Sequence, residues 1–203
     1  MHVPSGHPAR SSNLWAPELY LNETPAEADE RDRSLVVRYL EGHRDAGNGL
    51  VDRYHKRLFN VAYRMLDSVQ DAEDVTQTVF LNAFLNLRTY DPRYRFFSWI
   101  YRMTVNESLN VLKRRKPTVT LDEELEIRAP GAAPDGTAEA EDGVGRALRG
   151  LRPDDRAVLV LKHFVSFSYQ EIADVLEVPV KTVKSRLFTA RERLRLALGE
   201  GVR

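Results

Sequence analysis

Apolar residues recur every three or four positions over two long stretches of the chain, residues 34–116 and residues 143–200. That spacing lines up along one face of an α-helix, and no stretch alternates for long enough to predict a strand. Between them, residues 117–142 carry three prolines and two glycines among eight acidic side chains, a composition typical of a flexible linker. We therefore expect an all-α fold of two small helical domains joined by an acidic flexible linker.

The same pattern divides the chain into four segments. Residues 1–33 are polar, proline-containing and acidic, so we interpret them as a loose N-terminal extension. Residues 34–116 form the first predicted domain, with a turn from Gly42 to Gly49. Residues 117–142 are the linker, and residues 143–203 form the second domain.

The second domain contains the pattern of a helix-turn-helix. Ser168 can cap a helix, and Glu171, three residues later, can reach back to the Ser168 backbone N–H to complete a capping box. The pair Glu177-Val178 is then the turn. Pro179 suits the start of the next helix, because proline has a fixed φ and no N–H to lose. Residues that repeat at three- and four-residue steps along this helix should face the core; they are Val180, Val183, Leu187, Ala190 and Leu194.

The opposite side of that second helix is rich in basic and hydroxyl side chains. Such a face fits the DNA major groove, where short donors read base edges and cations hold phosphates. The candidate DNA-binding residues are Lys181, Thr182, Lys184, Ser185, Arg186, Phe188, Thr189 and Arg191.

A helix of the first domain has two apolar faces. We place its N-cap at Asp71, with Glu73 and Asp74 in the first turn. One face carries Val75, Val79, Phe80, Ala83 and Leu87, and the other carries two leucines that need a cover. Either this helix is buried on both sides or the second face docks a partner helix, and periodicity leaves both open. The candidate partner-binding residues are Asp71, Asp74, Gln77, Thr78, Leu81 and Leu85.

The next segment, residues 90–116, interleaves aromatic rings with arginines and ends in four cations. Rings stack on bases of single-stranded nucleic acid, and exposed amides can bind an extruded base. Most rings on a helix are core, and we expect Phe96, Ile100 and at least one of Trp99 and Tyr101 to lie in the core. A solvated helix end is the plain alternative. The candidate DNA-binding residues are Tyr94, Arg95, Phe96, Trp99, Arg102, Asn106, Asn110 and Lys113.

The net charge of the chain does not indicate nucleic-acid binding, because Lys plus Arg equal Asp plus Glu at 30 each. Phosphate attraction extends over only about 8–10 Å, so local clusters decide binding.

The chain has no cysteine, which removes disulfides and thiolate metal sites and agrees with a reducing cytoplasm. No apolar run approaches a membrane span, so we expect a soluble, cytoplasmic protein without membrane insertion.

Catalytic patterns are missing from the sequence. His43, His55 and His163 are scattered, with no two at metal-ligand spacing, and no phosphate-binding glycine loop or nucleophile motif is present. We therefore expect no enzymatic activity, no cofactor and no metal.

Three motifs together resemble the extracytoplasmic-function (ECF) group of bacterial RNA polymerase sigma factors of the sigma-70 family. They begin at Asp71, at Phe97 and at Ser168, in the order and roughly the spacing of that family. The resemblance implies that the helix after Asp71 docks on clamp helices of core RNA polymerase. It implies that residues 90–116 recognise and melt the promoter −10 element, and that residues 143–203 read the duplex −35 element. An anti-sigma factor is a further candidate partner.

A free-standing helix-turn-helix repressor or activator is the alternative function. It would account for residues 143–200 but leaves the aromatic and basic segment of the first domain without a role. A repressor should bind promoter duplex alone, whereas a sigma factor should need core polymerase.

Overall fold

The structure is a computed structural model that describes residues 24–115 and 143–199, and all of its regular elements there are helical. The prediction of an all-α fold is therefore confirmed, whereas the predicted linker and most of the N-terminal extension lie outside the described residues. The elements are α1 (Pro25–Leu40), α2 (Arg44–Leu66), α3 (Val69–Asn86), a 3-10 turn η2 (Leu87–Thr89), α4 (Phe96–Arg115), α5 (Gly143–Arg149), α6 (Pro153–His163), α7 (Tyr169–Leu176) and α8 (Val180–Gly199).

Helix α1 corrects the expectation that residues up to 33 are a loose extension. The helix begins at Pro25, and Thr24 caps it: the Thr24 side chain accepts from the Glu27 N–H, and the Glu27 carboxylate accepts from the Thr24 N–H. A capping box followed by proline in the first turn is a sequence pattern that indicates a helix start. The acidic composition of residues 1–33 had favoured a loose segment instead.

A buried ionic cluster fastens α1 to α2. Asp32 and Arg53 are almost fully buried, and the Arg53 Nε lies 2.7 Å from the Asp32 Oδ1. The Tyr54 hydroxyl donates to the other carboxylate oxygen, Asp32 Oδ2. Burial raises the pKa of the Asp32 carboxyl, although the bonds from Tyr54 and Arg53 favour its charged form. A residue expected in a loose extension is thus part of the domain interior.

Gly47 lies inside α2, although we expected a turn from Gly42 to Gly49. Gly42 is in the turn, with a φ of 101°, but α2 begins at Arg44. A Cβ on Gly47 would lie only 2.8 Å from the Tyr39 ring of α1. Glycine therefore permits the close approach of two helices here rather than breaking one.

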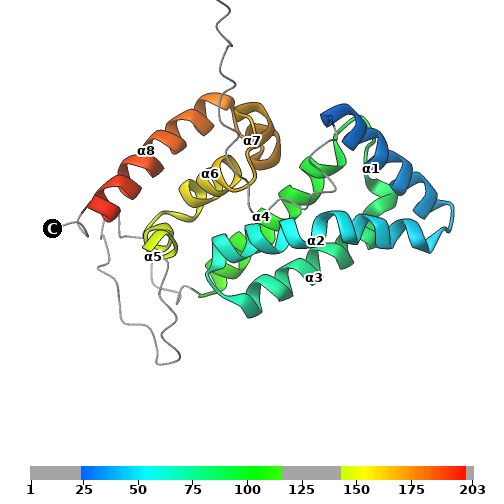
Figure 1. Cartoon of the computed structure of the whole chain (residues 1–203), viewed down its shortest axis with the longest axis horizontal. Coiled ribbons are helices and arrows are strands. Elements are labelled where there is room, and N and C mark those ends of the chain that lie inside the picture. The colour runs from blue at the N-terminus through cyan, green and yellow to red at the C-terminus, as the bar shows by residue number, and fades with distance from the viewer. Residues whose placement is uncertain (1–23, 116–142, 200–203) are drawn as a thin grey trace, which may run out of the picture.

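Helices α2, α3 and α4 pack on one another around the core of the first unit, and α1 covers α2 and α4 (Figure 1). The inner face of α3 is buried as its periodicity predicts. The largest fully buried side chains of this unit are Leu50, Leu58, Met65, Leu87 and Ile100.

Helices α5 to α8 form the second unit, and the predicted helix-turn-helix is confirmed. Ser168 and Glu171 form the capping box of α7, and Glu177 ends α7 in the left-handed conformation at φ 53°. The Pro179 carbonyl accepts from the Val183 N–H, so Pro179 stands at the start of α8. The predicted inner positions of α8 face the core, with Val183, Leu187 and Ala190 fully buried.

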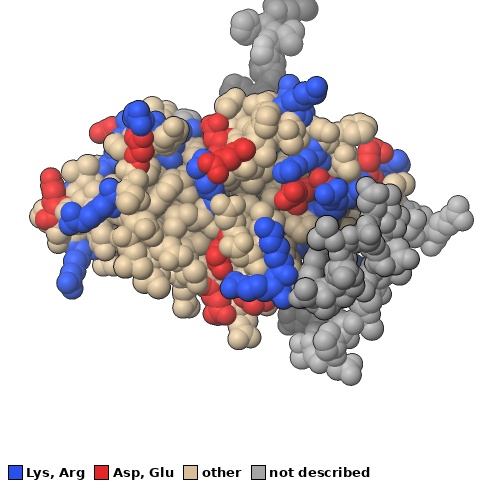
Figure 2. All heavy atoms as spheres, turned by 180° about the vertical axis from the view of Figure 1, so that it is seen from behind, with Lys and Arg blue, Asp and Glu red and all other residues tan. Residues whose placement is uncertain are grey.

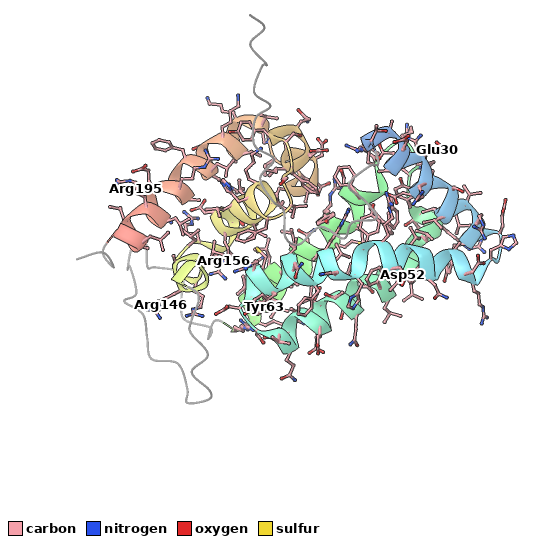
Figure 3. The ribbon with its side chains drawn as sticks, in the orientation of Figure 1. Glu30, Asp52, Tyr63, Arg146, Arg156 and Arg195 are labelled. Atoms are coloured by element: carbon pink, nitrogen blue, oxygen red, sulfur yellow. The ribbon has the colours of Figure 1, made fainter. Side chains whose placement is uncertain are left out.

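The two units pack against each other. One apolar cluster runs through both, and Phe167, just before α7, lies with its ring centroid 5.1 Å from Phe97 and 5.0 Å from Tyr101 on α4. Buried Arg156 of α6 donates to the Met65 carbonyl at the end of α2, and Figure 3 shows it reaching toward the part of α2 that carries Tyr63. Burial lowers the pKa of Arg156 to about 10.

Candidate nucleic-acid and partner interfaces

The outer face of α3 is an exposed apolar surface. Leu81 is 61% exposed and Leu85 is 71% exposed, whereas Val75 and Val79 on the opposite face are buried. Among the described residues, α3 is therefore not buried on both sides, which was one of the two interpretations that periodicity left open. Exposed leucines that repeat on one helix face are suited to a partner surface. We call Leu81 and Leu85, with Asp74, Gln77 and Thr78 at their rim, the α3 outer face.

The prediction that Asp71 is the N-cap of α3 is wrong. The helix begins at Val69, and the Ser68 hydroxyl accepts from the Asp71 N–H, so Ser68 is the cap. Asp71 stands within the first turn and pairs with Arg115 of α4. Both serine and aspartate are good caps, and the sequence does not rank them. Of the candidates beside it, Asp74 and Gln77 are exposed and Thr78 is half-buried.

The aromatic segment before α4 divides into core rings and exposed rings. Phe96 is only 2% exposed and packs against Tyr54, Tyr90 and Trp99. The expectation that Phe96 belongs to the core is confirmed, and its place among the DNA-contacting candidates is corrected. Tyr90 is also buried, which raises the pKa of its hydroxyl to about 12. Tyr94 is largely exposed, and the half-buried Trp99 rests on the Tyr90 ring.

Helix α4 carries the predicted mixed stripe on its surface. Asn106, Asn110 and Lys113 are exposed, and Arg102 is half-buried. The Asn110 amide nitrogen lies 3.4 Å from the Glu107 carboxylate, at the long end for a hydrogen bond, so the amide can turn to another partner. We call Trp99, Arg102, Asn106, Asn110 and Lys113 the α4 stripe.

The arginines at the start of this surface are bound to other parts of the chain. Arg95 pairs with Asp29 of α1 at 2.7 Å and with Glu171 of α7 at 2.9 Å. Arg102 pairs with Glu177 at 2.8 Å. Asp29 and the acids of α7 were not among the sequence candidates, and no local pattern could have found them, because they are distant in sequence from their partners.

Helix α8 presents the predicted outward face to solvent. Lys181, Lys184, Ser185, Phe188 and Arg191 are exposed, with Phe188 at 71%. Thr182, Thr189 and Arg186 are half-buried, and Arg186 pairs with Asp154 of α6 at 3.2 Å.

His163 of α6 lies beside α8, 3.4 Å from the Arg191 guanidinium. Partial burial, with Arg191 and Lys162 nearby, lowers the pKa of the His163 ring. His163 therefore adds little positive charge to the α8 surface at neutral pH.

The three candidate surfaces do not converge on one pocket. Helix α8 packs on α5, α6 and α7, and α6 stands between α8 and α2 (Figure 1). Basic and acidic side chains are interspersed on the face that Figure 2 shows, rather than gathered into one basic field. A chain with separate α3, α4 and α8 surfaces is suited to a large partner and an extended nucleic acid.

The described residues contain no group of three or more metal-ligating side chains. Within the same ranges, no helix is long and apolar enough to cross a membrane.

Two regions of the chain match known families. Residues 50–118 match Sigma-70 region 2, and residues 142–194 match Sigma-70, region 4. The chain is 32% identical over 179 residues to the ECF RNA polymerase sigma factor SigW of Bacillus subtilis, a match that covers 82% of this chain and 96% of the relative. It is 34% identical over 176 residues to the ECF RNA polymerase sigma-E factor of Escherichia coli strain K12, covering 80% and 92%.

Solved structures are similar over most of the chain. CnrH, in complex with the cytosolic domain of CnrY, superposes with a TM-score of 0.67 at 28% identity, covering 84% of this chain and 98% of CnrH. The sigma factor RpoE of Bartonella quintana, in complex with the anti-sigma factor NepR, shares the fold with a TM-score of 0.58 at 22% identity, covering 75% and 96%.

Two helical units, one with a helix-turn-helix and one with an exposed apolar helix face, define the class of a DNA-binding transcription factor. The chain belongs to the sigma-70 family of bacterial RNA polymerase sigma factors, in its ECF group. Its function is that of a sigma factor, a non-enzymatic initiation factor that binds core RNA polymerase and promoter DNA. The resemblance drawn from the sequence is thereby confirmed.

Proposed function

We propose that the three surfaces divide the work of promoter recognition among themselves. The α3 outer face docks on core polymerase, the α4 stripe binds the melted −10 element, and the outward face of α8 reads the duplex −35 element. The observation that carries this proposal is the exposure of Leu81 and Leu85 on a helix whose other face is buried. Neighbouring apolar side chains exposed on one helix face are typical of a surface that binds another protein.

The α4 stripe supplies the chemistry for an opened strand. Tyr94 and Trp99 offer rings on which bases can stack, and the amides of Asn106 and Asn110 can hydrogen-bond the edge of an extruded base. Lys113 stands one to two turns further along the helix and can hold a phosphate. Phe96 acts from the core, by supporting the Trp99 ring at 5.7 Å between centroids.

The outward face of α8 supplies the chemistry for a duplex. Lys181, Thr182 and Ser185 offer donors for base edges, while Lys184 and Arg191 can neutralise phosphates. Phe188 is a large exposed ring suited to contact a thymine methyl group.

We place the polymerase-binding domain at residues 24–116 and the −35-reading domain at residues 143–203, since α1 belongs to the first unit. The linker at residues 117–142 stays a prediction. The site of action is the cytoplasm, together with core polymerase. One similar structure is a complex with an anti-sigma factor, and we propose a partner of that kind for this chain.

Transcription from a library of random promoters, with purified chain and core polymerase from the source bacterium, tests this function. We expect a pair of enriched elements spaced as −10 and −35 elements, and no transcripts without the chain. A chain that binds duplex tightly alone and directs no transcription by core polymerase would instead be a free-standing repressor or activator.

A further inference from the structure

The loop between η2 and α4, residues 90–95, presents an aromatic ring to solvent. Tyr94 is 66% exposed, whereas Tyr90 and Phe96 on either side of it are buried. Loop backbones usually move more than the elements they connect, so an exposed ring on a loop has no fixed orientation of its own. In this chain, however, contacts fix the backbone of Tyr94 from both directions.

A β-turn of residues 91–94 forms the tip of this loop. The Tyr94 N–H donates to the Asp91 carbonyl at 3.0 Å, and the Asp91 carboxylate accepts from the Arg93 N–H at 3.0 Å. Aspartate in the first position and proline in the second, here Pro92, are residues that such a turn favours. The Arg93 guanidinium also pairs with Asp91 at 2.6 Å. Local contacts therefore close the turn and bind the N–H of Tyr94.

Tyr90 fixes the other side of the Tyr94 backbone. The Tyr90 hydroxyl donates to the Tyr94 carbonyl at 2.5 Å. The Tyr90 ring is held in turn by Phe96 and Trp99, with centroids 5.6 Å and 5.4 Å away. Because burial raises the pKa of this hydroxyl to about 12, it is protonated and can donate throughout the neutral range. Both backbone groups of Tyr94 are thus hydrogen-bonded.

Asp29 of α1 fixes the residue that follows. Arg95 donates from its Nε to the Asp29 carboxylate, at 2.8 Å from Oδ1 and 2.7 Å from Oδ2. The Arg95 guanidinium also lies 4.2 Å from the centroid of the Phe97 ring. Glu171 of α7 binds a different nitrogen of Arg95, Nη1, so the Asp29 contact stands within the first unit by itself.

Helix α1 is therefore part of the support of the loop. Its first turns lie beside the start of α4 (Figure 1), and it contacts both η2 and α4, the two elements that the loop joins. The match to Sigma-70 region 2 begins at residue 50, so Asp29 is outside it. The contact with Asp29 is a feature of this chain that the family match does not assign.

We propose that Asp29 and Tyr90 are positioning residues for promoter recognition, which hold the turn so that the Tyr94 ring can stack on a base of the opened −10 strand. This inference rests on the proposed function, in which this side of the first unit binds that strand. Arg95 then acts by joining the loop to α1, and not by touching DNA. A loop already held in its binding conformation loses little conformational freedom when the base arrives, so positioning raises the affinity for the correct base.

The strength of one hydrogen bond sets the size of the effect. The net contribution of a single intramolecular hydrogen bond corresponds to about a two- to tenfold change in an equilibrium constant. Loss of the Tyr90 bond or of the Asp29 contact should therefore weaken base discrimination by about that factor. The loss should fall at the promoter position that Tyr94 contacts and at no other.

Conservative substitutions separate positioning from stability. Tyr90→Phe keeps the packing of the ring and removes only the hydroxyl. Asp29→Ala removes the contact with Arg95, whereas Asp29→Glu keeps a carboxylate at this place. The matched controls are Tyr63→Phe, at a half-buried tyrosine of α2, and Glu30→Gln, at an exposed acid next to Asp29 on α1.

Selection from promoters with a randomised −10 element, transcribed by core polymerase loaded with each full-length variant, measures the effect. Tyr94→Ala identifies the promoter position that the ring reads. We expect Tyr90→Phe and Asp29→Ala to flatten the preference at that same position, and Asp29→Glu and both controls to keep the preference of the parent. A merely structural role would instead lower the thermal unfolding midpoint and reduce transcription from all sequences alike. An unchanged preference in both Tyr90→Phe and Asp29→Ala would overturn the proposal.

A double-mutant cycle tests the role of Arg95. If Arg95 acts only through Asp29, then Arg95→Ala should cause no further loss of preference in a chain that already carries Asp29→Ala. Additive losses would show that Arg95 touches DNA and would contradict the role given to it here.

Failure of the proposed function looks different from failure of this inference. In the first case the parent chain directs no transcription by core polymerase. In the second, the parent transcribes and Tyr94→Ala alters one promoter position, but Tyr90→Phe and Asp29→Ala alter none. That result would remove the positioning role alone.

Discussion

The Tyr54 hydroxyl donates a hydrogen bond to Asp32, inside a cluster in which Asp32 also pairs with buried Arg53. This links the second helix to the first, at a carboxylate almost without solvent contact. Buried charges are tolerated only when their hydrogen bonds are made, so each partner in the cluster matters for stability.

Tyr54→Phe should destabilise the fold in a pH-dependent way. Burial raises the pKa of Asp32 above that of the unfolded chain, so the contribution of Asp32 to stability is full below about pH 4 and is lost as pH rises through its native pKa. The Tyr54 bond opposes this shift by stabilising the carboxylate. Removal of this hydrogen bond should lower the free energy of unfolding by about 1.5–3 kcal/mol at pH 7, and by less toward pH 4. Urea unfolding at several pH values measures this, with Tyr63→Phe, a half-buried tyrosine elsewhere on α2, as control. A loss independent of pH would show that Asp32 is not the partner that matters.

Gly47→Ala should destabilise the fold even though alanine is the better helix former. The new Cβ would stand 2.8 Å from the Tyr39 ring, and overpacking of this kind typically costs about 1–3 kcal/mol. The helix-propensity gain of about 1 kcal/mol offsets only part of that cost. Thermal unfolding should show a lower midpoint, whereas Asn48→Ala, exposed on the same helix, should leave it equal or higher. A raised midpoint for Gly47→Ala would mean that Tyr39 moves aside freely.

Leu81→Glu or Leu85→Glu should abolish binding to core polymerase without unfolding the chain. Both side chains are already largely exposed, so a charge there costs the fold little, but it would be buried in a docked complex. Co-purification with core polymerase and circular dichroism measure the two effects. Val37→Glu, at a 53% exposed apolar position on α1, is the control that should retain binding. Retained binding by both leucine variants would exclude the α3 outer face as the docking surface.

Asn106→Ala should impair promoter melting more than initial promoter binding. The amide is exposed on the α4 stripe and can bond an extruded base, which exists only after the strands separate. Permanganate reactivity of melted thymines should fall, while the amount of promoter complex in a gel shift changes little. Asn48→Ala lacks any role in the stripe and should behave as the parent. Equal losses in both assays would indicate that Asn106 acts before melting.

Changes at Lys181 or Ser185 should alter which −35 sequence is preferred. Each lost contact to a base edge is worth about 1–3 kcal/mol of discrimination. Lys184→Ala should instead weaken binding to all sequences alike, because a phosphate contact carries no base information. Selection from a randomised −35 library separates these outcomes, with Lys56→Ala, an exposed lysine of α2, as control. An unchanged preference in the Lys181 and Ser185 variants would assign base reading to other side chains of α8.

Some features differ from the sequence expectation for specific physical reasons. Residues 25–33 belong to α1, because the capping box of Thr24 and Glu27 begins a helix in spite of the acidic composition there. Gly47 lies in a helix and not in a turn, because its small size makes room for the Tyr39 ring, which comes from another helix. Phe96 and Trp99 stand three residues apart in one aromatic segment, yet the first is core and the second is half-exposed, a difference that depends on which neighbours pack on them.

Local periodicity and capping determined, from the sequence alone, the all-α fold, the helix-turn-helix and the outward faces of α3, α4 and α8, because these depend on residues a few positions apart. The resemblance to sigma factors followed from three such local motifs. Only the tertiary structure decided that Asp32 is buried beside Arg53, and that Arg95 and Arg102 are held by α7. Those contacts join residues 21 to 76 positions apart, and they form through packing of whole helices, which no local pattern records.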